Sequence, residues 1–345
     1  MDRKLRWGIL GTGNIARQFA AGVTASSRCQ LAAVGSRTAK KASDFAAEFQ
    51  IPAAHGEYAG LINQKNIDAI YVSLPNSMHH EWTIAALKAG KHVLCEKPLA
   101  SNAAEAEEMF DVAKAAGRVL IEALMYRSHP LTLAIVDAVK SGTIGELKII
   151  RTSFCFSARV RQGNIRFSSE LAGGSLMDVG CYCISLSRLL AGSEPKSIQC
   201  VGQLLESGVD EYAAGTLVFP NGIVASMMCG LTVHADNTAW LCGTEGYIEI
   251  PIPWKPPAGQ AVYVVSRSAP PRMDAPGEKP VTPGSAPKDV RQVAAPGELY
   301  GFEADDFAAA VLDGTSPRVT RSDSIGNMRV LDEMRRQIGV RISGG

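Results

Sequence analysis

Short apolar runs alternate with longer stretches of mixed polarity from residue 5 to about residue 120. The apolar runs are bounded by turn residues and are too short for buried helices, so they predict strands. The expected strands are 5–10, 30–35, 53–54, 68–73, 92–97 and 119–123, and the expected helices are 17–25, 39–49, 58–62, 81–89 and 101–116. Strands and helices in alternation predict a mainly parallel sheet that is covered on both faces.

After a further expected helix at 130–141, the pattern changes to strands joined by turns. The expected strands are 146–157, 197–202, 213–219, 223–231, 240–244, 247–251 and 261–265. The tripeptide Pro220-Asn221-Gly222 between two of them is typical of a hairpin. Residues 251–296 are rich in proline and predict an extended excursion with short strands, and helices are expected at 300–312 and 322–338. This part therefore predicts an α+β unit with a large, mainly antiparallel sheet.

Composition and charge exclude several classes of protein. The 345 residues are 46% hydrophobic and 20% charged, with a formal net charge of +1. This balance gives no support for binding to nucleic acid or to an anionic membrane, and no apolar run reaches the length of a membrane span. The first expected strand begins close to Met1 and leaves no room for a signal peptide, so a cytoplasmic protein is expected. Eight cysteines without metal-site spacing indicate reduced core residues and no bound metal.

A glycine-rich turn follows the first expected strand. The text Gly11-Thr12-Gly13-Asn14-Ile15-Ala16 leads directly into an expected helix. Strand, tight turn and helix in this order are the setting of the Gly-x-Gly-x-x-Gly/Ala dinucleotide motif. Gly11 permits the turn, Gly13 lets the backbone approach a pyrophosphate, and the helix N-terminus offers N–H groups to its oxygens. The sequence therefore predicts a dinucleotide-binding domain over residues 1–124.

The end of the second expected strand indicates which dinucleotide is bound. Ser36, Arg37 and Lys41 occur where an NAD-preferring site would usually show a carboxylate that accepts from the ribose 2′-hydroxyl. The first carboxylate after this strand is Asp44. A hydroxyl and cations suit a 2′-phosphate, so NADP is favoured over NAD. The alternative interpretation is that these cations lie on the solvated start of a helix.

A lysine stands at the end of the fifth expected strand. The apolar residues 92–95 lead into Glu96-Lys97, and Pro98 ends the strand because it has no N–H to donate. The carboxyl ends of parallel strands form the ligand crevice of an open α/β sheet, so Lys97 is expected to point at the bound ligand. The ordinary alternative is a surface lysine at a strand end.

A second set of polar residues follows the turn Gly173-Gly174. Asp178 and Tyr182 lie four residues apart in an apolar stretch that predicts a helix, so their side chains are expected on one face. A carboxylate is costly to bury unless it is paired, and Lys97 is a suitable partner. The alternative is a carboxylate near a helix N-terminus with a core tyrosine one turn later.

In combination, these motifs resemble the Gfo/Idh/MocA oxidoreductase family. The shared features are the Gly-Thr-Gly turn, Pro75-Asn76-x-x-His79, Glu96-Lys97-Pro98 and Gly-Gly-x-x-x-Asp178-x-x-x-Tyr182, in this order and across essentially the whole chain. A tyrosine in place of the commoner histidine resembles the branch with dihydrodiol dehydrogenases, NADP-linked xylose dehydrogenases and glucose-fructose oxidoreductases. The resemblance implies an N-terminal Rossmann domain and, over 125–345, a substrate-binding and oligomerisation domain. It also implies a C-terminal helix that packs back on the first domain, and dimers or tetramers assembled through the open sheet.

The resemblance also implies roles for individual residues. Lys97, Asp178 and Tyr182 would be catalytic, with Tyr182 exchanging a proton with the substrate and Lys97 lowering the pKa of its phenol. The implied cofactor-binding residues are Gly11, Thr12, Gly13, Asn14, Ile15, Ser36, Arg37, Lys41, Pro75, Asn76, His79, Glu96 and Lys97. The implied substrate-binding residues are Lys97, Arg127, Arg166, Asp178 and Tyr182. The alternatives are turn and capping roles for Asn76 and His79, and solvated loop positions for the arginines.

Three classes of function remain open at this point. The favoured class is an NADP-dependent dehydrogenase of a small carbohydrate-like substrate, a sugar or a related cyclic alcohol. The second is a ketoreductase or glycoside 3-dehydrogenase that acts on a ring carbon of a larger sugar. The third is a non-catalytic, NADP-responsive binding protein, which would need the phosphate-binding turn but not Lys97, Asp178 and Tyr182.

Overall fold

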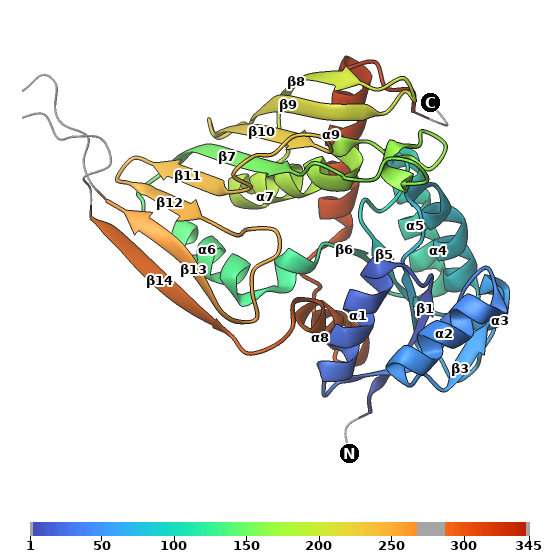
Figure 1. Ribbon diagram of the computed structural model, residues 1–345. Helices are drawn as coiled ribbons and strands as arrows, with labels where there is room; N and C mark the ends of the chain where they lie inside the picture. The colour runs from blue at the N-terminus through green and yellow to red at the C-terminus, as the bar shows by residue number, and fades with distance from the viewer. Residues whose placement is uncertain (1–2, 268–286, 343–345) are drawn as a thin grey trace, which may run out of the picture.

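The computed structural model describes residues 3–267 and 287–342, and within them the chain forms two sheets (Figure 1). The first sheet has six strands in the order β3-β2-β1-β4-β5-β6, and each neighbouring pair is parallel. Its strands are β1 (Leu5–Leu10), β2 (Cys29–Gly35), β3 (Ala53–His55), β4 (Ala69–Val72), β5 (His92–Glu96) and β6 (Leu120–Ala123). The helices between them are α1 (Asn14–Ala25), α2 (Ala39–Phe49), α3 (Tyr58–Ile62), α4 (His79–Lys88) and α5 (Ala103–Ala116). The predicted alternation and parallel sheet are confirmed.

The order of strands reverses between β1 and β4. The chain runs outward from β1 through β2 to β3, then returns to the other side of β1 and continues from β4 to β6. In open α/β sheets, ligands bind in the crevice beyond the carboxyl ends of the strands at such a reversal. The residues that follow Leu10, Val72 and Glu96 therefore border this crevice.

The second sheet has eight strands in the order β14-β13-β12-β11-β7-β10-β9-β8. The β7–β10 pair is parallel and the other neighbouring pairs are antiparallel, as predicted. Its strands are β7 (Leu147–Cys155), β8 (Ser197–Leu204), β9 (Asp210–Val218), β10 (Val224–Gly230), β11 (Ala239–Gly243), β12 (Tyr247–Ile250), β13 (Gly259–Ser266) and β14 (Lys288–Ala295). The predicted β9–β10 hairpin is confirmed, and Gly222 supplies its left-handed residue with a φ of 87°. The predicted strand at 261–265 falls within β13, and residues 268–286 of the proline-rich excursion lie outside the described residues.

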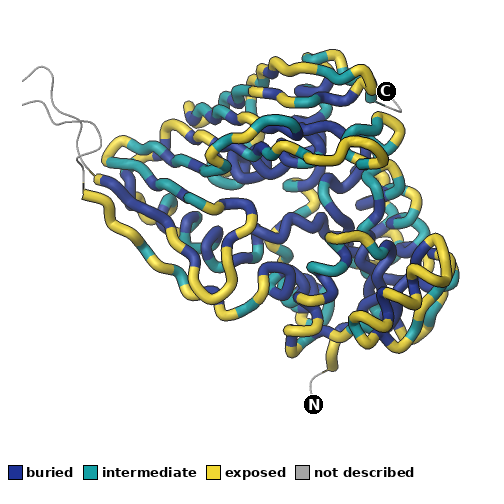
Figure 2. Tube along the Cα trace, viewed as in Figure 1, coloured by how far each residue is buried: buried dark blue, intermediate teal, exposed yellow. Residues whose placement is uncertain are grey.

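The second sheet presents two different faces. Helices α6 (Pro130–Lys140), α7 (Cys181–Ala191) and α9 (Arg321–Gln337) pack against strands of this sheet. The strand register places exposed apolar side chains together on the opposite face, and Figure 2 shows exposed and half-buried positions along these strands. We call this surface the open face; its exposed apolar residues are Ile149, Val201, Tyr212, Met228, Val262 and Val290.

Two C-terminal helices join the second sheet to the first. Helix α8 (Leu299–Leu312) packs on α1 so closely that a Cβ at Gly22 would lie 2.6 Å from the backbone nitrogen of Gly301. Helix α9 contacts α5, and the backbone N–H of Ala103 donates to Asp332 Oδ2 over 2.8 Å. A capping box between Thr320 and Asp323 starts α9. These contacts hold the two sheets in a fixed relation on either side of the crevice.

The cysteines belong to the interior, as predicted. All eight are free; seven are buried and Cys242 is half-buried.

Among the described residues, no helix is both long enough and apolar enough to cross a bilayer.

Candidate active site

The turn after β1 has the geometry of a pyrophosphate site. Gly11 has a φ of 103°, and a Cβ there would lie 2.8 Å from the carbonyl oxygen of Ser73, so the position requires glycine. Gly13 is the N-cap of α1 and has no side chain to occupy the first N–H groups of the helix. The space beside its Cα is open, because a Cβ built there meets nothing within 4 Å. An anion can therefore approach the N-terminus of α1 directly.

The end of β2 fits a phosphate better than a ribose hydroxyl. Ser36 is buried, and its Oγ lies 3.3 Å from Thr12 Oγ. Arg37 and Lys41 are exposed, and neither has a carboxylate within ion-pair distance in the described part of the chain. The first carboxylate after the strand, Asp44, is bound by Lys40 Nζ at 2.8 Å. The two free cations beside Ser36 are thus available to a 2′-phosphate.

Four of the predicted residues converge at the carboxyl end of β5. Lys97 Nζ donates to the carbonyl oxygen of Asp178 over 2.8 Å and to Asp178 Oδ1 over 3.1 Å. The other carboxylate oxygen, Oδ2, accepts from Arg166 Nε over 2.6 Å. The Lys97 ammonium also lies over the ring of Tyr182, 5.2 Å from its centroid. Residues from three separate segments of the chain therefore meet at one charged cluster.

The segment that carries Asp178 departs from the regular helix that the spacing predicts. Leu176–Gly180 form a π-helical turn, and α7 begins only at Cys181. Asp210 holds the start of this turn, because its Oδ2 accepts from Ser175 Oγ and from the backbone N–H of Leu176, each over 2.6 Å. Asp178 and Tyr182 still reach the same lysine, the first through its carboxylate and the second through its ring face. Single π turns of this kind occur frequently at functional sites.

The charges of this cluster stabilise one another. Burial acts to raise the pKa of Asp178, but Lys97 and Arg166 outweigh it and hold that pKa below its ordinary value. Burial acts to lower the pKa of Lys97, and the adjacent Asp178 carboxylate brings it above its ordinary value instead. Both groups are therefore ionised at neutral pH. Glu96 differs, because burial raises its pKa; its carboxylate accepts from the hydroxyl of Tyr71 and the backbone N–H of Lys97.

Tyr182 lies in an aromatic enclosure, and this overturns one expectation. Its ring centroid is 5.3 Å from that of Phe154 and 6.0 Å from that of Trp254, and its hydroxyl donates to Met125 Sδ over 3.4 Å. Burial raises the pKa of Tyr182 well above its ordinary value, and the prediction that Lys97 lowers this pKa is wrong. The reason is geometric: the ammonium lies over the face of the ring and does not bond to the hydroxyl. Tyr182 is a neutral phenol in this structure.

The remaining predicted residues lie around this cluster or apart from it. Asn76 follows Pro75 at the end of β4, and its Nδ2 donates to the carbonyl oxygen of Ala172 over 2.8 Å. His79 is fully buried, with Nδ1 3.0 Å from the carbonyl oxygen of Pro98 and Nε2 2.9 Å from that of Leu74. It therefore ties together the loops that follow β4 and β5.

Arg127 does not join the cluster around Lys97. Its guanidinium is buried and donates to Ser185 Oγ, the carbonyl oxygen of Arg318 and Asp323 Oδ1. These partners lie on α7, before α9 and in α9, so in this structure Arg127 links α7 to the start of α9.

Sequence reasoning missed Trp254, which forms one wall of the site. It comes from the connection between β12 and β13, and its ring stacks on Phe154 at 5.7 Å with an interplanar angle of 10°. Its indole N–H donates to the carbonyl oxygen of Ser153 over 2.8 Å. A tryptophan between two prolines directly after a strand, Pro253-Trp254-Lys255-Pro256, was the available signal. Among the described residues, no three His, Cys, Asp or Glu side chains gather in a way that would hold a metal ion.

The cluster combines the groups that a hydride-transfer site needs. Lys97 offers a fixed ammonium that can donate to an oxygen carrying developing negative charge. The neutral phenol of Tyr182 can give up a proton and, as phenolate, take one back. Both lie beside the crevice that the glycine turn of β1 also borders.

Two domain families match this chain. Residues 5–124 match the family described as "Oxidoreductase family, NAD-binding Rossmann fold", and residues 132–249 match the "GFO/IDH/MocA C-terminal domain". The two matches fall on the two sheets in turn.

Relatives of known activity match over nearly the full chain. A D-xylose 1-dehydrogenase (NADP(+)) of Haloferax volcanii is 34% identical and aligns over 95% of each chain. A trans-1,2-dihydrobenzene-1,2-diol dehydrogenase of Mus musculus is 34% identical over 97% of each. Among solved structures, an aldose-aldose oxidoreductase from Caulobacter crescentus has a TM-score of 0.85 at 27% identity, covering 97% of both chains. A tyrosine-to-phenylalanine mutant of a 3-ketoreductase from Actinomadura kijaniata, in complex with TDP-benzene and NADP, has a TM-score of 0.83 at 28% identity, covering 97% of this chain and 98% of that one.

Proposed function

The chain belongs to the Gfo/Idh/MocA oxidoreductase family, and from this premise we propose that it transfers hydride between NADP and a hydroxyl-bearing carbon of a sugar or related cyclic alcohol. The observation that carries the proposal is the position of Lys97. Its ammonium is held between Asp178 and the ring of Tyr182 at the end of β5, next to the crevice of the first sheet. The similar D-xylose and dihydrodiol dehydrogenases oxidise substrates of this kind.

NADP fits the residues around the crevice. The open N-terminus of α1 would take the pyrophosphate, and Ser36, Arg37 and Lys41 would take the 2′-phosphate. NADP is also the cofactor named for the Haloferax dehydrogenase and bound in the Actinomadura ketoreductase. When bound, it accepts or returns the hydride.

The residues of the cluster would have separate roles in the reaction. Lys97 donates a hydrogen bond to the reacting oxygen and stabilises the negative charge that develops there. Tyr182 exchanges the proton with that oxygen, and its neutral state makes it a donor in the reductive direction. Asp178 keeps Lys97 in place and offers its carboxylate to neighbouring substrate hydroxyls, with Arg166 fixing its orientation.

The test is reduction of NADP⁺, measured by nicotinamide absorbance, across a panel of aldoses, glycosides, inositols and a trans-dihydrodiol, with NAD⁺ in parallel. We expect turnover of at least one sugar or diol with NADP⁺, and a loss of about a hundredfold or more in Tyr182→Phe. Tight binding of NADPH with no turnover of any member in either direction would contradict the proposal and favour a non-catalytic binding protein.

A second candidate reaction is reduction of a ring ketone on a larger sugar. Two observations favour it: the neutral phenol of Tyr182 is ready to donate, and the chain resembles a 3-ketoreductase over nearly its whole length. Oxidation of NADPH by a 3-ketosugar, faster than reduction of NADP⁺ by any aldose, would assign this reaction instead.

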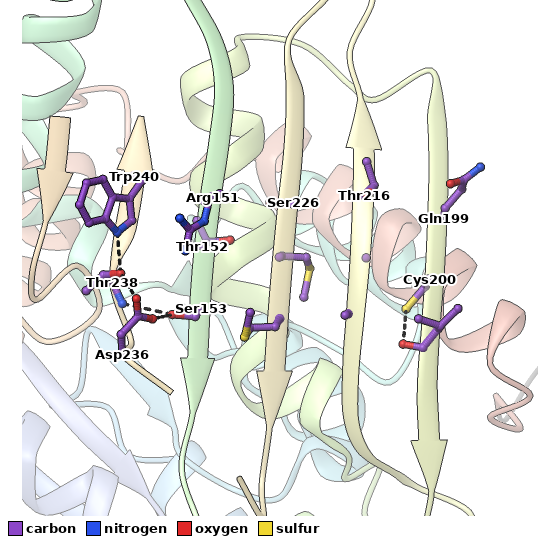
Figure 3. Close-up of a pocket in the computed structure, with 15 residues that line it drawn as sticks. Arg151, Thr152, Ser153, Gln199, Cys200, Thr216, Ser226, Asp236, Thr238 and Trp240 are labelled. Carbon is purple, nitrogen blue, oxygen red and sulfur yellow. Dashed lines mark hydrogen bonds between the residues drawn. The ribbon is translucent and has the colours of Figure 1, made fainter. Parts of the chain in front are cut away.

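We further infer that two or four copies assemble through the open face. Two of its exposed apolar residues, Val201 and Met228, line a hollow of about 380 Å³. Figure 3 shows this hollow with Arg151 and Trp240 near one end and Gln199 near the other. Burying exposed apolar side chains such as Met228 against a second copy would favour assembly, because it removes apolar surface from water. Met228→Glu should therefore shift the protein to monomer in sedimentation, and a wild type that is itself monomeric would contradict the inference.

A cytoplasmic setting is supported by the eight free cysteines, because a reducing compartment keeps thiols unpaired.

A further inference from the structure

The side chain of Asn76 joins two segments that are 96 residues apart in the sequence. Asn76 begins the short 3₁₀ turn after β4 of the first sheet, whereas Ala172 lies in the connection between β7 and α7. The amide Nδ2 of Asn76 donates to the carbonyl oxygen of Ala172 over 2.8 Å. A carbonyl oxygen only accepts hydrogen bonds, so the nitrogen of this amide must be the atom that faces it. The bond therefore links the crevice of the first sheet to the segment that leads into Asp178.

The carbonyl of Ala172 is presented by an uncommon backbone conformation. Ala172 has a φ of 53°, in the left-handed region that a residue with a Cβ enters only at a cost. Its N–H donates to the carbonyl oxygen of Ser169 over 3.1 Å, within the same loop. Residues in such conformations cluster at functional sites, where the surrounding structure holds them in place. The bond from Asn76 is one of the contacts that hold Ala172.

The two glycines after Ala172 are bonded to both members of an ion pair in the site. The N–H of Gly174 donates to the carbonyl oxygen of Arg166 over 2.8 Å, and its carbonyl oxygen accepts from the N–H of Asp178 over 3.0 Å. Gly173 packs so closely that a Cβ there would lie 2.4 Å from the carbonyl oxygen of Arg166. The side chains of Arg166 and Asp178 then bond to each other through Nε and Oδ2. A shift of Ala172 would therefore be passed on to both side chains.

Other parts of the site have anchors that do not involve Asn76. Asp210 accepts two hydrogen bonds at the start of the π-helical turn. Tyr182 is held by its aromatic neighbours, among them Phe154. Loss of the Asn76 bond should therefore leave the fold and the position of Tyr182 unchanged and loosen the loop that carries Arg166.

We propose that Asn76 is a positioning residue of the substrate site. Its amide holds the Ala172 turn in place, and the turn sets the orientation of Arg166 and Asp178. This rests on the proposed function and adds a residue to the substrate side of the same site. The amide of Asn76 thus acts on the substrate-binding loop, a role that differs from the cofactor binding implied by the family resemblance. Because Tyr182 is held separately, the bond serves substrate binding more than hydride transfer.

The test compares Asn76→Ala and Asn76→Asp with the wild type, using the best substrate of the panel described above at saturating NADP⁺. Asn63→Ala, the same change at an exposed asparagine at the end of α3, is the matched control. We expect Asn76→Ala to raise the KM of the substrate about fivefold, the size of one neutral hydrogen bond, with kcat within about twofold of the wild type. Asn76→Asp should raise KM further, because its carboxylate and the facing carbonyl oxygen both only accept. Asn63→Ala should leave both constants unchanged.

Three further measurements separate positioning from a merely structural or a cofactor-binding role. In an Arg166→Met background, Asn76→Ala should raise KM by less than about twofold, because the side chain through which Asn76 acts is gone. The Kd for NADP⁺ in fluorescence titration should be the same in Asn76→Ala and the wild type. In hydrogen–deuterium exchange, the backbone amides of residues 166–174 should exchange about fivefold faster in Asn76→Ala than in the wild type or Asn63→Ala.

The outcomes distinguish the role of Asn76 from the function itself. An unchanged KM in Asn76→Ala, an equal rise in KM with and without Arg166, or a Kd for NADP⁺ that rises as much as KM would overturn the role. Unchanged exchange over residues 166–174 would overturn it as well, and this measurement requires no turnover. A wild type that turns over no sugar or diol contradicts the proposed function instead, while the exchange rates still decide whether Asn76 holds the turn.

Discussion

Removal of the Asp178 charge should destabilise the fold, because the site is built around a nearly buried ion pair. The side chains of Lys97 and Asp178 are each 14% exposed, and the shortest distance between their charged atoms is 3.1 Å. In Asp178→Asn the side chain keeps its volume and one acceptor oxygen but loses its charge. In the wild type the Asp178 carboxylate accepts from both Lys97 and Arg166. In the variant these two cations lie close together with no negative charge between them.

The magnitude follows from two opposing effects. At 3.1 Å the Coulomb attraction is about 5 kcal/mol for an effective dielectric constant of about 20. Desolvation of the two groups offsets several kcal/mol of this attraction, so the net coupling should be about 1–3 kcal/mol. Deleting only one partner costs more than the coupling, about 3 kcal/mol, because an unpaired charge remains in the interior.

Urea unfolding of a double-mutant cycle measures both quantities. The four proteins are the wild type, Lys97→Met, Asp178→Asn and the double variant, compared at neutral pH and with NADP absent. We expect Lys97→Met to recover part of the stability lost in Asp178→Asn, because it removes the unpaired ammonium. A coupling energy below about 0.5 kcal/mol would contradict the expected stabilisation by this ion pair, since it would mean that the two side chains act independently.

Three further predictions concern other parts of the molecule. Arg37→Gln should raise the Kd for NADP⁺ by about tenfold or more and leave the Kd for NAD⁺ nearly unchanged in fluorescence titration; equal effects on both would remove Arg37 from the phosphate site. Burial raises the pKa of Glu122 to about 7 from 4.5, so the folded state binds a proton that the unfolded state releases, and stability should fall as pH rises between these values. Glu122→Gln should remove this pH dependence of the free energy of unfolding, and above pH 7 it should be more stable than the wild type by up to about 3 kcal/mol in thermal or urea unfolding. Parallel profiles of stability against pH in the two proteins would contradict this. Gly11→Ala should cost about 1–3 kcal/mol and abolish dinucleotide binding, because its φ is 103° and its Cβ would meet Ser73 O at 2.8 Å; a variant that binds NADP⁺ normally would contradict the assigned turn.

The parts of the site that follow local rules could be predicted from the sequence. Gly11 and Gly13 are recognisable because a strand, a turn and a helix follow one another within a few residues. Lys97 is recognisable because the carboxyl ends of parallel strands share one edge of the sheet. Its pairing with Asp178, 81 residues away, followed from the cost of burying a carboxylate alone, and the structure shows that bond.

The features that depend on distant packing could not be predicted in this way. Trp254 reaches Tyr182 through the path of the connection between β12 and β13. The local text Pro253-Trp254-Lys255-Pro256 marks the tryptophan but does not give that path. The pKa of Tyr182 was expected to fall, but its aromatic neighbours raise it, and those neighbours come from separate segments. The π-helical turn at Leu176–Gly180 is bonded at its start by Asp210, a residue of the distant strand β9.

The most direct test of the proposed active site is the single-turnover rate of hydride transfer with a substrate deuterated at the reacting carbon. It is measured by nicotinamide absorbance in the wild type, Tyr182→Phe and Lys97→Met, with the Kd for NADP⁺ determined in parallel. Both variants should bind NADP⁺ with near wild-type affinity and transfer hydride at least about a hundredfold more slowly, with a deuterium isotope effect on the observed rate. Hydride transfer at the wild-type rate in both variants would contradict the assignment of this cluster as the active site.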